Sequence, residues 1–93
     1  MSDAGPMARV QVVVERTFPE PVRFEEVQAR EDAAAWCLEA HGVRFLRTFF
    51  SADRTRMICV YEAPDAESVR LANRTAGLPF DAAWAASAYG ESD

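Results

Sequence analysis

Three side chains of this 93-residue chain are the candidate ligands for a divalent transition metal. His41, the single histidine, offers an imidazole nitrogen, Cys59 offers a thiolate sulfur and Glu15 offers a carboxylate. Nickel and zinc accept nitrogen and sulfur ligands readily. One histidine cannot build a multi-imidazole centre within a protomer, and the two cysteines do not form a C-x-x-C pair. The three residues are candidate metal ligands without a metal-binding motif.

Each candidate ligand also has a structural explanation, and the sequence leaves both open. His41 is expected at the end of a helix, where a group that can carry positive charge interacts favourably with the helix dipole. Cys59 and the second cysteine, Cys37, lie in apolar stretches and are typical of buried thiols in a reducing compartment. Glu15 could instead form a salt bridge with an arginine across the sheet.

A second group of residues has the composition of a small-ligand cavity. Arg47 could orient a polar substituent, and rings for the walls come from Phe45, Phe49, Tyr61 and Trp84. Small-ligand sites are mostly apolar with few polar groups. The same rings would also pack well against a partner subunit. No nucleophile elbow or glycine-rich phosphate loop accompanies them, so no reaction is predicted.

The composition limits the class of partner. Ten basic and fifteen acidic residues give a net charge of −5, which argues against nucleic acid or an anionic membrane surface. No apolar run approaches the roughly 20 residues of a membrane-spanning helix. Residues 1–8 lack the basic start and apolar core of a secretory signal. We therefore expect a cytoplasmic protein that binds neither nucleic acid nor membrane.

Strands must position part of this chemistry. Residues 9–17 place valines on one face at every second position, which predicts a strand. Residues 43–51 and 56–63 predict two more strands, joined by a hairpin turn at residues 52–55. The alanine-rich segment near the end is ambiguous by local propensity. We predict a strand around residues 82–88 because the preceding pattern requires one.

Two segments predict helices. Residues 24–41 contain no Gly or Pro and carry an apolar stripe at helical spacing, and Gly42 is expected to end this helix in a left-handed conformation. Asp65 is the expected cap of a second helix. Gly77, followed by Pro79, ends it.

The predicted order, β-α-β-β-α-β, is typical of the ferredoxin-like arrangement of the α+β class. This is a four-stranded antiparallel sheet with both helices on one face. We assign residues 9–89 to a single domain, residues 1–8 to a flexible N-terminal lead-in and residues 90–93 to a C-terminal tail.

The face of the sheet without helices must meet water or another protein. By alternation, it is expected to carry Gln11, Val13, Glu15, Phe45, Arg47, Phe49, Met57, Cys59 and Tyr61. The large apolar side chains of this set would form a patch too large for a monomer surface. We therefore expect a homodimer that joins two such faces, with polar groups of the patch lining a cavity.

Four short blocks resemble a family of small bacterial proteins catalogued as a domain of unknown function. They are V-E-R at Val14–Arg16, G-V-R-F-L-R at Gly42–Arg47, C-V-Y-E-A-P at Cys59–Pro64 and A-G-L-P at Ala76–Pro79. A nickel-binding protein is the described member of this family. The resemblance implies a dimeric α+β barrel, in which two ferredoxin-like protomers join their sheets. It also implies nickel binding in at least one relative and no established reaction.

One block differs from the family pattern. Many relatives carry a histidine in a block reading R-E-H-A in the second helix, whereas this chain reads R-L-A-N at Arg70–Asn73. We predict a homodimeric binding protein for nickel or another divalent transition metal, with Glu15, His41 and Cys59 as candidate ligands. The alternatives are a cofactor-independent barrel enzyme of the oxygenase or cyclase kind, a small-ligand-binding module, and a structural or regulatory module without a ligand.

Overall fold

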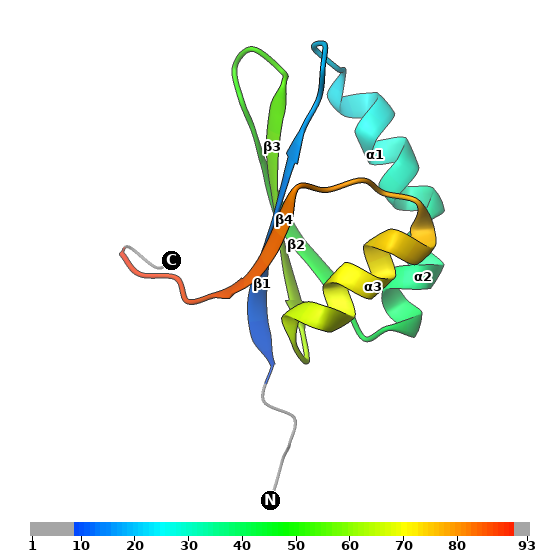
Figure 1. Cartoon of the computed structure of the whole chain (residues 1–93), viewed down its shortest axis with the longest axis vertical. Coiled ribbons are helices and arrows are strands. Elements are labelled where there is room, and N and C mark those ends of the chain that lie inside the picture. Colours follow the sequence, from blue (N-terminus) through cyan, green and yellow to red (C-terminus); the bar gives the residue numbers. More distant parts are fainter. Residues whose placement is uncertain (1–8, 91–93) are drawn as a thin grey trace, which may run out of the picture.

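A four-stranded antiparallel sheet carries three helices on one face (Figure 1). The computed structural model describes residues 9–90, so the predicted lead-in at residues 1–8 and residues 91–93 of the tail lie outside the described residues. The elements are β1 (Val10–Thr17), α1 (Phe24–Ala33), α2 (Ala35–Ala40), β2 (Arg44–Phe50), β3 (Arg56–Ala63), α3 (Ala66–Ala76) and β4 (Ala82–Ala86). The strand order is β2-β3-β1-β4. The predicted α+β, ferredoxin-like fold is confirmed.

Local signals place most element ends where the sequence predicts them. The Asp65 carboxylate caps α3 by accepting a 2.7 Å hydrogen bond from the backbone N–H of Ser68. Gly77 ends α3 with φ at 75°, and Gly42 follows α2 with φ at 72°. Both conformations are left-handed, as predicted. The last strand is also confirmed, although β4 ends at Ala86.

The helix predicted over residues 24–41 is instead two helices, and that prediction is wrong. They meet at Ala34, whose φ of −96° and ψ of 1° leave the helical range and whose backbone N–H is shared between two carbonyls of the preceding turn. Beyond this break, α2 packs on α3, and the Cys37 thiol donates to the Ala72 carbonyl at 3.5 Å. A run of alanines favours helix throughout, so the sequence carries no signal for the break.

The ladder between β1 and β3 fixes which side chains face the helices. Val12 lies opposite Tyr61 and Val14 lies opposite Cys59, and all four are fully buried. Directly opposite residues of an antiparallel pair share a face. The prediction that Met57, Cys59 and Tyr61 lie on the uncovered face is therefore wrong. Both faces of β3 carry apolar side chains, so the alternation of residues alone does not show which face of this strand is buried.

A β-bulge in β2 divides the strand between the two faces. Phe45 pairs with Tyr61, but two residues later Arg47 pairs with Val60, so one extra residue lies between them. Phe45 consequently faces the helix side, contrary to prediction. Arg47 and Phe49, beyond the bulge, lie on the uncovered face as predicted.

The core fills the space between the sheet and the helices. Its buried members are Val12, Val14, Val27, Leu38, Val43, Met57, Cys59, Tyr61, Ala63, Val69, Ala72 and Ala83. None of the helices within residues 9–90 is long and apolar enough to cross a membrane.

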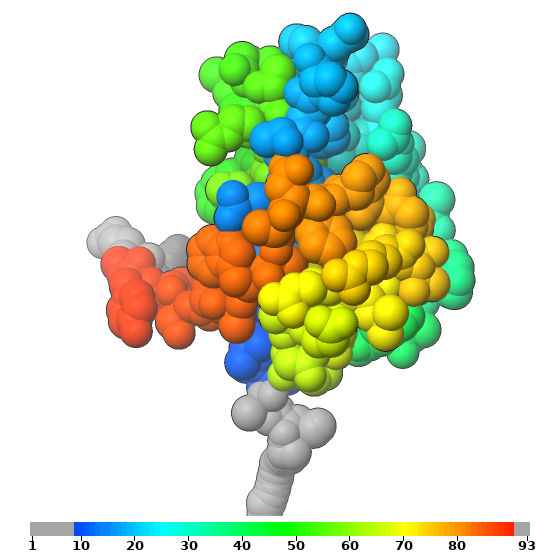
Figure 2. Space-filling model, in the orientation of Figure 1, coloured from blue at the N-terminus to red at the C-terminus, as the bar shows by residue number. Residues whose placement is uncertain are grey.

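The hairpin between β2 and β3 lies beside the segment that follows β1, as the space-filling view shows (Figure 2). The backbone N–H of Phe18 donates to the Thr55 carbonyl at 2.8 Å, and that of Val22 donates to the Arg54 carbonyl at 3.0 Å. These two bonds fix the apolar side chains of Phe18 and Val22 beside the first turns of α1.

Candidate functional site

The three predicted metal ligands lie in three different environments. Glu15 is on the uncovered face, where its carboxylate accepts a 2.7 Å hydrogen bond from Trp84 Nε1. Cys59 is on the opposite face and fully buried. His41 follows α2, with Nδ1 2.9 Å from the Cys37 carbonyl oxygen. Within residues 9–90, no three His, Cys, Asp or Glu side chains gather closely enough to hold a metal ion. The three candidate ligands therefore do not converge on one site within the described part of the chain.

The predicted cavity residues are also separated by the sheet. Tyr61 and Phe45 lie on the helix side, with ring centroids 5.8 Å apart. Arg47 and Phe49 lie on the uncovered face. These four residues cannot line one cavity, and the alternative that uses Tyr61 with Arg47 loses its geometric basis.

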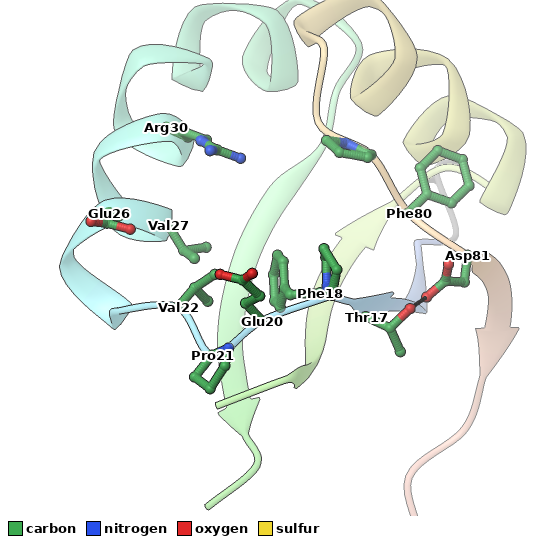
Figure 3. A pocket seen from close by; sticks show the side chains of 12 residues that line it. Thr17, Phe18, Glu20, Pro21, Val22, Glu26, Val27, Arg30, Phe80 and Asp81 are labelled. Carbon is green, nitrogen blue, oxygen red and sulfur yellow. Dashed lines mark hydrogen bonds between the residues drawn. The ribbon is translucent and has the colours of Figure 1, made fainter. Parts of the chain in front are cut away.

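A cleft of about 520 Å³ opens at the end of β1, between α1 and the segment that leads into β4 (Figure 3). Phe18, Val22, Val27 and Phe80 supply apolar walls, and Arg30 extends from α1 toward the cleft. This volume is within the usual range of small-ligand pockets. Sequence reasoning missed the cleft because its walls come from loops and a helix that only the fold brings together.

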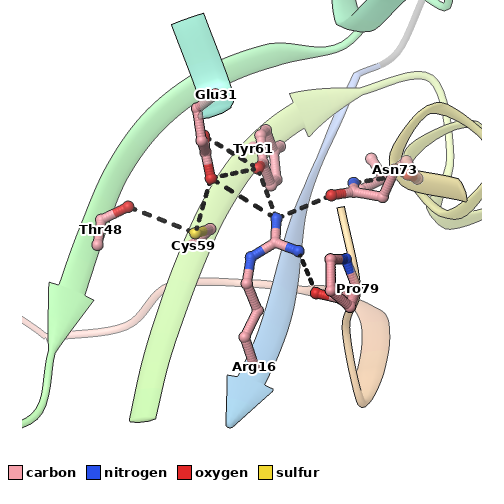
Figure 4. A network of polar contacts seen from close by, with 8 residues as sticks. Arg16, Glu31, Thr48, Cys59, Tyr61, Asn73 and Pro79 are labelled. Atoms are coloured by element: carbon pink, nitrogen blue, oxygen red, sulfur yellow. Dashed lines mark hydrogen bonds and ion pairs between the residues drawn. The ribbon is translucent and has the colours of Figure 1, made fainter. Parts of the chain in front are cut away.

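A network of buried polar side chains lies beside this cleft, between the sheet and the helices (Figure 4). Each layer of the fold contributes to it. Its members are Arg16 from β1, Glu31 from α1, Thr48 from β2, Cys59 and Tyr61 from β3, and Asn73 from α3.

Arg16 is the centre of the network and is only 5% exposed. One terminal nitrogen donates to the Pro79 carbonyl at 2.7 Å. The other donates to Asn73 Oδ1 at 2.8 Å and to the Tyr61 hydroxyl at 3.1 Å, and it lies 3.7 Å from Glu31 Oε2. Arg16 Nε has no hydrogen-bond partner among the described residues. One guanidinium thus links β1, β3, α1, α3 and the loop before β4.

Burial decides the protonation of the other members. Burial raises the pKa of the Glu31 carboxyl, although the Arg16 guanidinium lowers it in part. Burial, followed by the charge of Glu31, raises the pKa of the Cys59 thiol and of the Tyr61 hydroxyl. Cys59 and Tyr61 are therefore protonated at neutral pH and donate toward Glu31, at 3.6 Å and 3.4 Å. A protonated thiol is a poor nucleophile and a poor metal ligand.

The network is suited to the buried guanidinium of Arg16 and not to a metal ion. The Arg16 guanidinium already places a positive charge 3.7 Å from Glu31, which is the only carboxylate in the network. A second cation would be repelled and would meet only protonated Cys59 and Tyr61. The network holds the layers together and offers hydrogen-bond donors to the adjoining cleft.

Two patterns in the sequence are signals from which this network could have been predicted. Arg16 continues the series of Val12 and Val14, so a charged residue falls on the buried face of a strand. Glu31 follows Val27 by four residues and therefore shares the apolar stripe of its helix. A charge on an apolar face requires a buried partner, and these two residues supply it for each other.

The uncovered face is the second surface with possible function. Its larger side chains include Gln11, Val13, Glu15, Arg44, Arg47, Phe49, Ile58, Val60, Glu62 and Trp84. Phe49 and Trp84 are 61% and 46% exposed. Glu62 lies within 3.5 Å of Arg9 and 3.6 Å of Arg44, so its charge is compensated. Glu15 is the acidic group of this face that has no arginine partner among the described residues.

Comparison with known proteins identifies the family. Residues 13–85 match the model of the family described as nickel responsive protein SCO4226-like. The chain belongs to this family. Comparison with curated protein sequences gives no significant match. The family's description agrees with the resemblance found in the four sequence blocks.

The crystal structure of SCO4226 from Streptomyces coelicolor A3(2) has the same fold. It superimposes with a TM-score of 0.76 over 86% of this chain and 99% of that chain, at 15% sequence identity. At this identity the likeness establishes the arrangement of helices and strands and no more. The family's link to nickel is compatible with metal binding, but a single protomer lacks a converging set of ligands within residues 9–90.

Proposed function

We propose that the protein is a cytoplasmic, homodimeric binding protein whose ligand site lies between the uncovered faces of two sheets. The observation that carries this proposal is the apolar centre of that face, where Val13, Ile58 and Val60 lie between the exposed rings of Phe49 and Trp84. An exposed apolar surface of this kind is typical of interfaces. A two-fold axis would bury both copies of it together.

The charges of the face support self-association. Glu15 lies on β1 and Arg47 on β2, so the face carries charges of both signs at separate places. A two-fold rotation can bring the acidic part of one protomer against the basic part of the other.

Nickel is the metal we propose, with the Glu15 carboxylates of both protomers among its ligands. A centre shared between protomers is consistent with the absence of three converging donors in residues 9–90 of one protomer. Glu15 is better suited than Glu62, because Glu62 is already paired with Arg9 and Arg44. His41 and Cys59 lie away from this face, and we do not place them in the site.

The dimer is tested by sedimentation of the wild type and two matched variants. We expect the wild type to sediment at twice its chain mass of 10.3 kDa. Phe49→Asp should give a monomer because it places a charge in the interface. Leu71→Asp should remain dimeric, because Leu71 is 46% exposed on α3, on the other side of the molecule. A wild-type monomer at micromolar concentration would refute the proposed interface.

The metal is tested by calorimetric titration of metal-free protein with Ni²⁺. We expect saturable binding with one ion per dimer, and its loss in Glu15→Gln. Cys59→Ser is the control, because its thiol is buried on the opposite face and should not affect binding. Equal nickel affinity in Glu15→Gln and wild type would remove Glu15 from the site, and no heat in the wild type would remove the metal.

A further inference from the structure

The cleft at the end of β1 continues toward the buried network. A smaller cavity of about 20 Å³ shares Phe18, Val27, Arg30 and Pro79 with the cleft, and Arg16, Glu31 and Leu78 complete its lining. This volume admits about one water molecule or one ligand oxygen. An oxygen atom bound there would lie at the inner end of an otherwise apolar cleft.

Two arginines supply unused donors at this inner end. Arg16 is 95% buried, and its Nε is the one buried side-chain nitrogen or oxygen of the described residues without a partner. The Arg30 side chain forms no hydrogen bond or ion pair with another residue of the described part, and its guanidinium extends toward the cleft (Figure 3). The buried, unpaired Nε of Arg16 favours a ligand that can accept a hydrogen bond, and Arg30, whose side chain is exposed, can pair with the same ligand.

The acidic groups near the cleft do not cancel these donors. Glu31 is compensated by Arg16 at 3.7 Å. Asp81 accepts a 2.7 Å hydrogen bond from the Thr17 hydroxyl. Glu20 and Glu26 are exposed at the rim, where water screens their charge. With Arg16 and Glu31 paired, Arg30 gives the inner end a net positive charge that attracts an anion, and the walls attract an apolar group.

We propose that this cleft binds a small monocarboxylate with a flat apolar body. The carboxylate lies at the inner end, where Arg30 and Arg16 Nε donate to it, and the apolar body lies between Phe18 and Phe80. Arginine suits a carboxylate because its planar guanidinium matches the two carboxylate oxygens. This site is on the helix side of the sheet and does not depend on the homodimer or on nickel.

The experiment uses three probes of the same shape and different charge: benzoate, benzamide and benzylamine. Binding to the full chain is followed by amide chemical shifts during titration. We expect benzoate to bind with a dissociation constant of about 10 mM or lower. The shifts should be largest at Val27, Arg30 and Phe80. Benzamide should bind at least about tenfold more weakly and benzylamine more weakly still, because neither carries a negative charge.

Arg30→Gln is the decisive variant, and Arg23→Gln is its matched control. Arg30 is exposed and unpaired, so its loss should leave the fold intact and weaken benzoate binding about tenfold or more. Arg23, at the start of the same helix, does not line the cleft, and its variant should bind benzoate within about twofold of wild type.

Four results would overturn the proposal. They are an Arg30→Gln variant that binds benzoate like the wild type, benzamide or benzylamine binding as tightly as benzoate, chemical shifts confined to the uncovered face, and no saturable benzoate binding in the wild type. None of these results bears on dimerisation, because the sedimentation experiment uses Phe49→Asp and Leu71→Asp, and neither residue lines the cleft.

Discussion

Replacing Arg16 by methionine tests the role of the buried network. The substitution keeps much of the side-chain volume and removes the only cation of the network. Glu31, which is 9% exposed, then loses its compensating charge, and Asn73 Oδ1 and the Pro79 carbonyl lose their donor. Removing one member of a buried ion pair destabilises a protein by about 3–5 kcal/mol. A domain of this size has a total unfolding free energy of about 5–14 kcal/mol, so the loss is a large fraction of its stability.

The loss should depend on pH because Glu31 can escape its unpaired charge by binding a proton. In Arg16→Met, the folded-state pKa of Glu31 should rise further above its value in the unfolded chain. The stability gained from the protonated form is complete below the unfolded pKa and is lost as pH rises through the folded pKa. The difference between wild type and variant should therefore be largest near neutral pH and smaller at about pH 4.

Urea unfolding followed by circular dichroism measures this difference. With a slope of about 2 kcal/mol per molar urea, the midpoint of the variant should fall by about 2 M at pH 7. The double variant Arg16→Met, Glu31→Leu removes both charges and should recover about 1–3 kcal/mol. A loss below about 1 kcal/mol at pH 7, or an equal loss at pH 4 and pH 7, would refute the electrostatic explanation.

Three further predictions concern individual residues. Glu31→Gln should remove the pH dependence that the Glu31 carboxyl gives to stability. Because burial raises the pKa of Glu31, the unfolding free energy of the wild type minus that of the variant should fall as pH rises from 4 through the folded-state pKa. A difference that rises with pH would contradict this explanation. Gly77→Ala should lower the unfolding free energy, measured with urea, by about 1 kcal/mol. No atom lies within 4 Å of the added Cβ, so only the left-handed backbone at φ 75° opposes the alanine. An unchanged unfolding free energy would mean that α3 ends in another conformation. Cys37 and Cys59 are fully buried, so both thiols should react with a disulfide reagent only at the rate of unfolding, and fast labelling in the absence of urea would show local opening.

Much of the fold follows from local signals that act within a few residues. The strand β1 is predicted by its alternating valines, and α3 by Asp65 at its start and Gly77 at its end. These signals work because caps and left-handed glycines satisfy the backbone locally. The break at Ala34 has no such signal, since it depends on how α2 packs against α3.

The faces of β2 and β3 were not predictable in this way. In β3, Met57, Cys59 and Tyr61 alternate with residues that are also mostly apolar, so either phase fits the sequence. In β2, the bulge after Phe45 shifts the alternation by one residue, and a one-residue shift exchanges the two faces. The placement of Cys59 in the metal site failed for this reason. Glu15 kept its predicted face because the valines at every second position, Val12 and Val14, fix the buried face of β1.

The borders of the sheet determine which kinds of assembly are open to the protein. A neighbouring chain could lengthen the sheet only by aligning along an uninterrupted outer strand. At one border, β2 carries the bulge, which disturbs the regular spacing of its backbone groups. At the other border, β4 contains only five residues. Neither edge strand therefore favours the continuous addition of further chains along the sheet. Copies of the chain can instead associate by stacking the faces of their sheets, which gives an assembly of limited size.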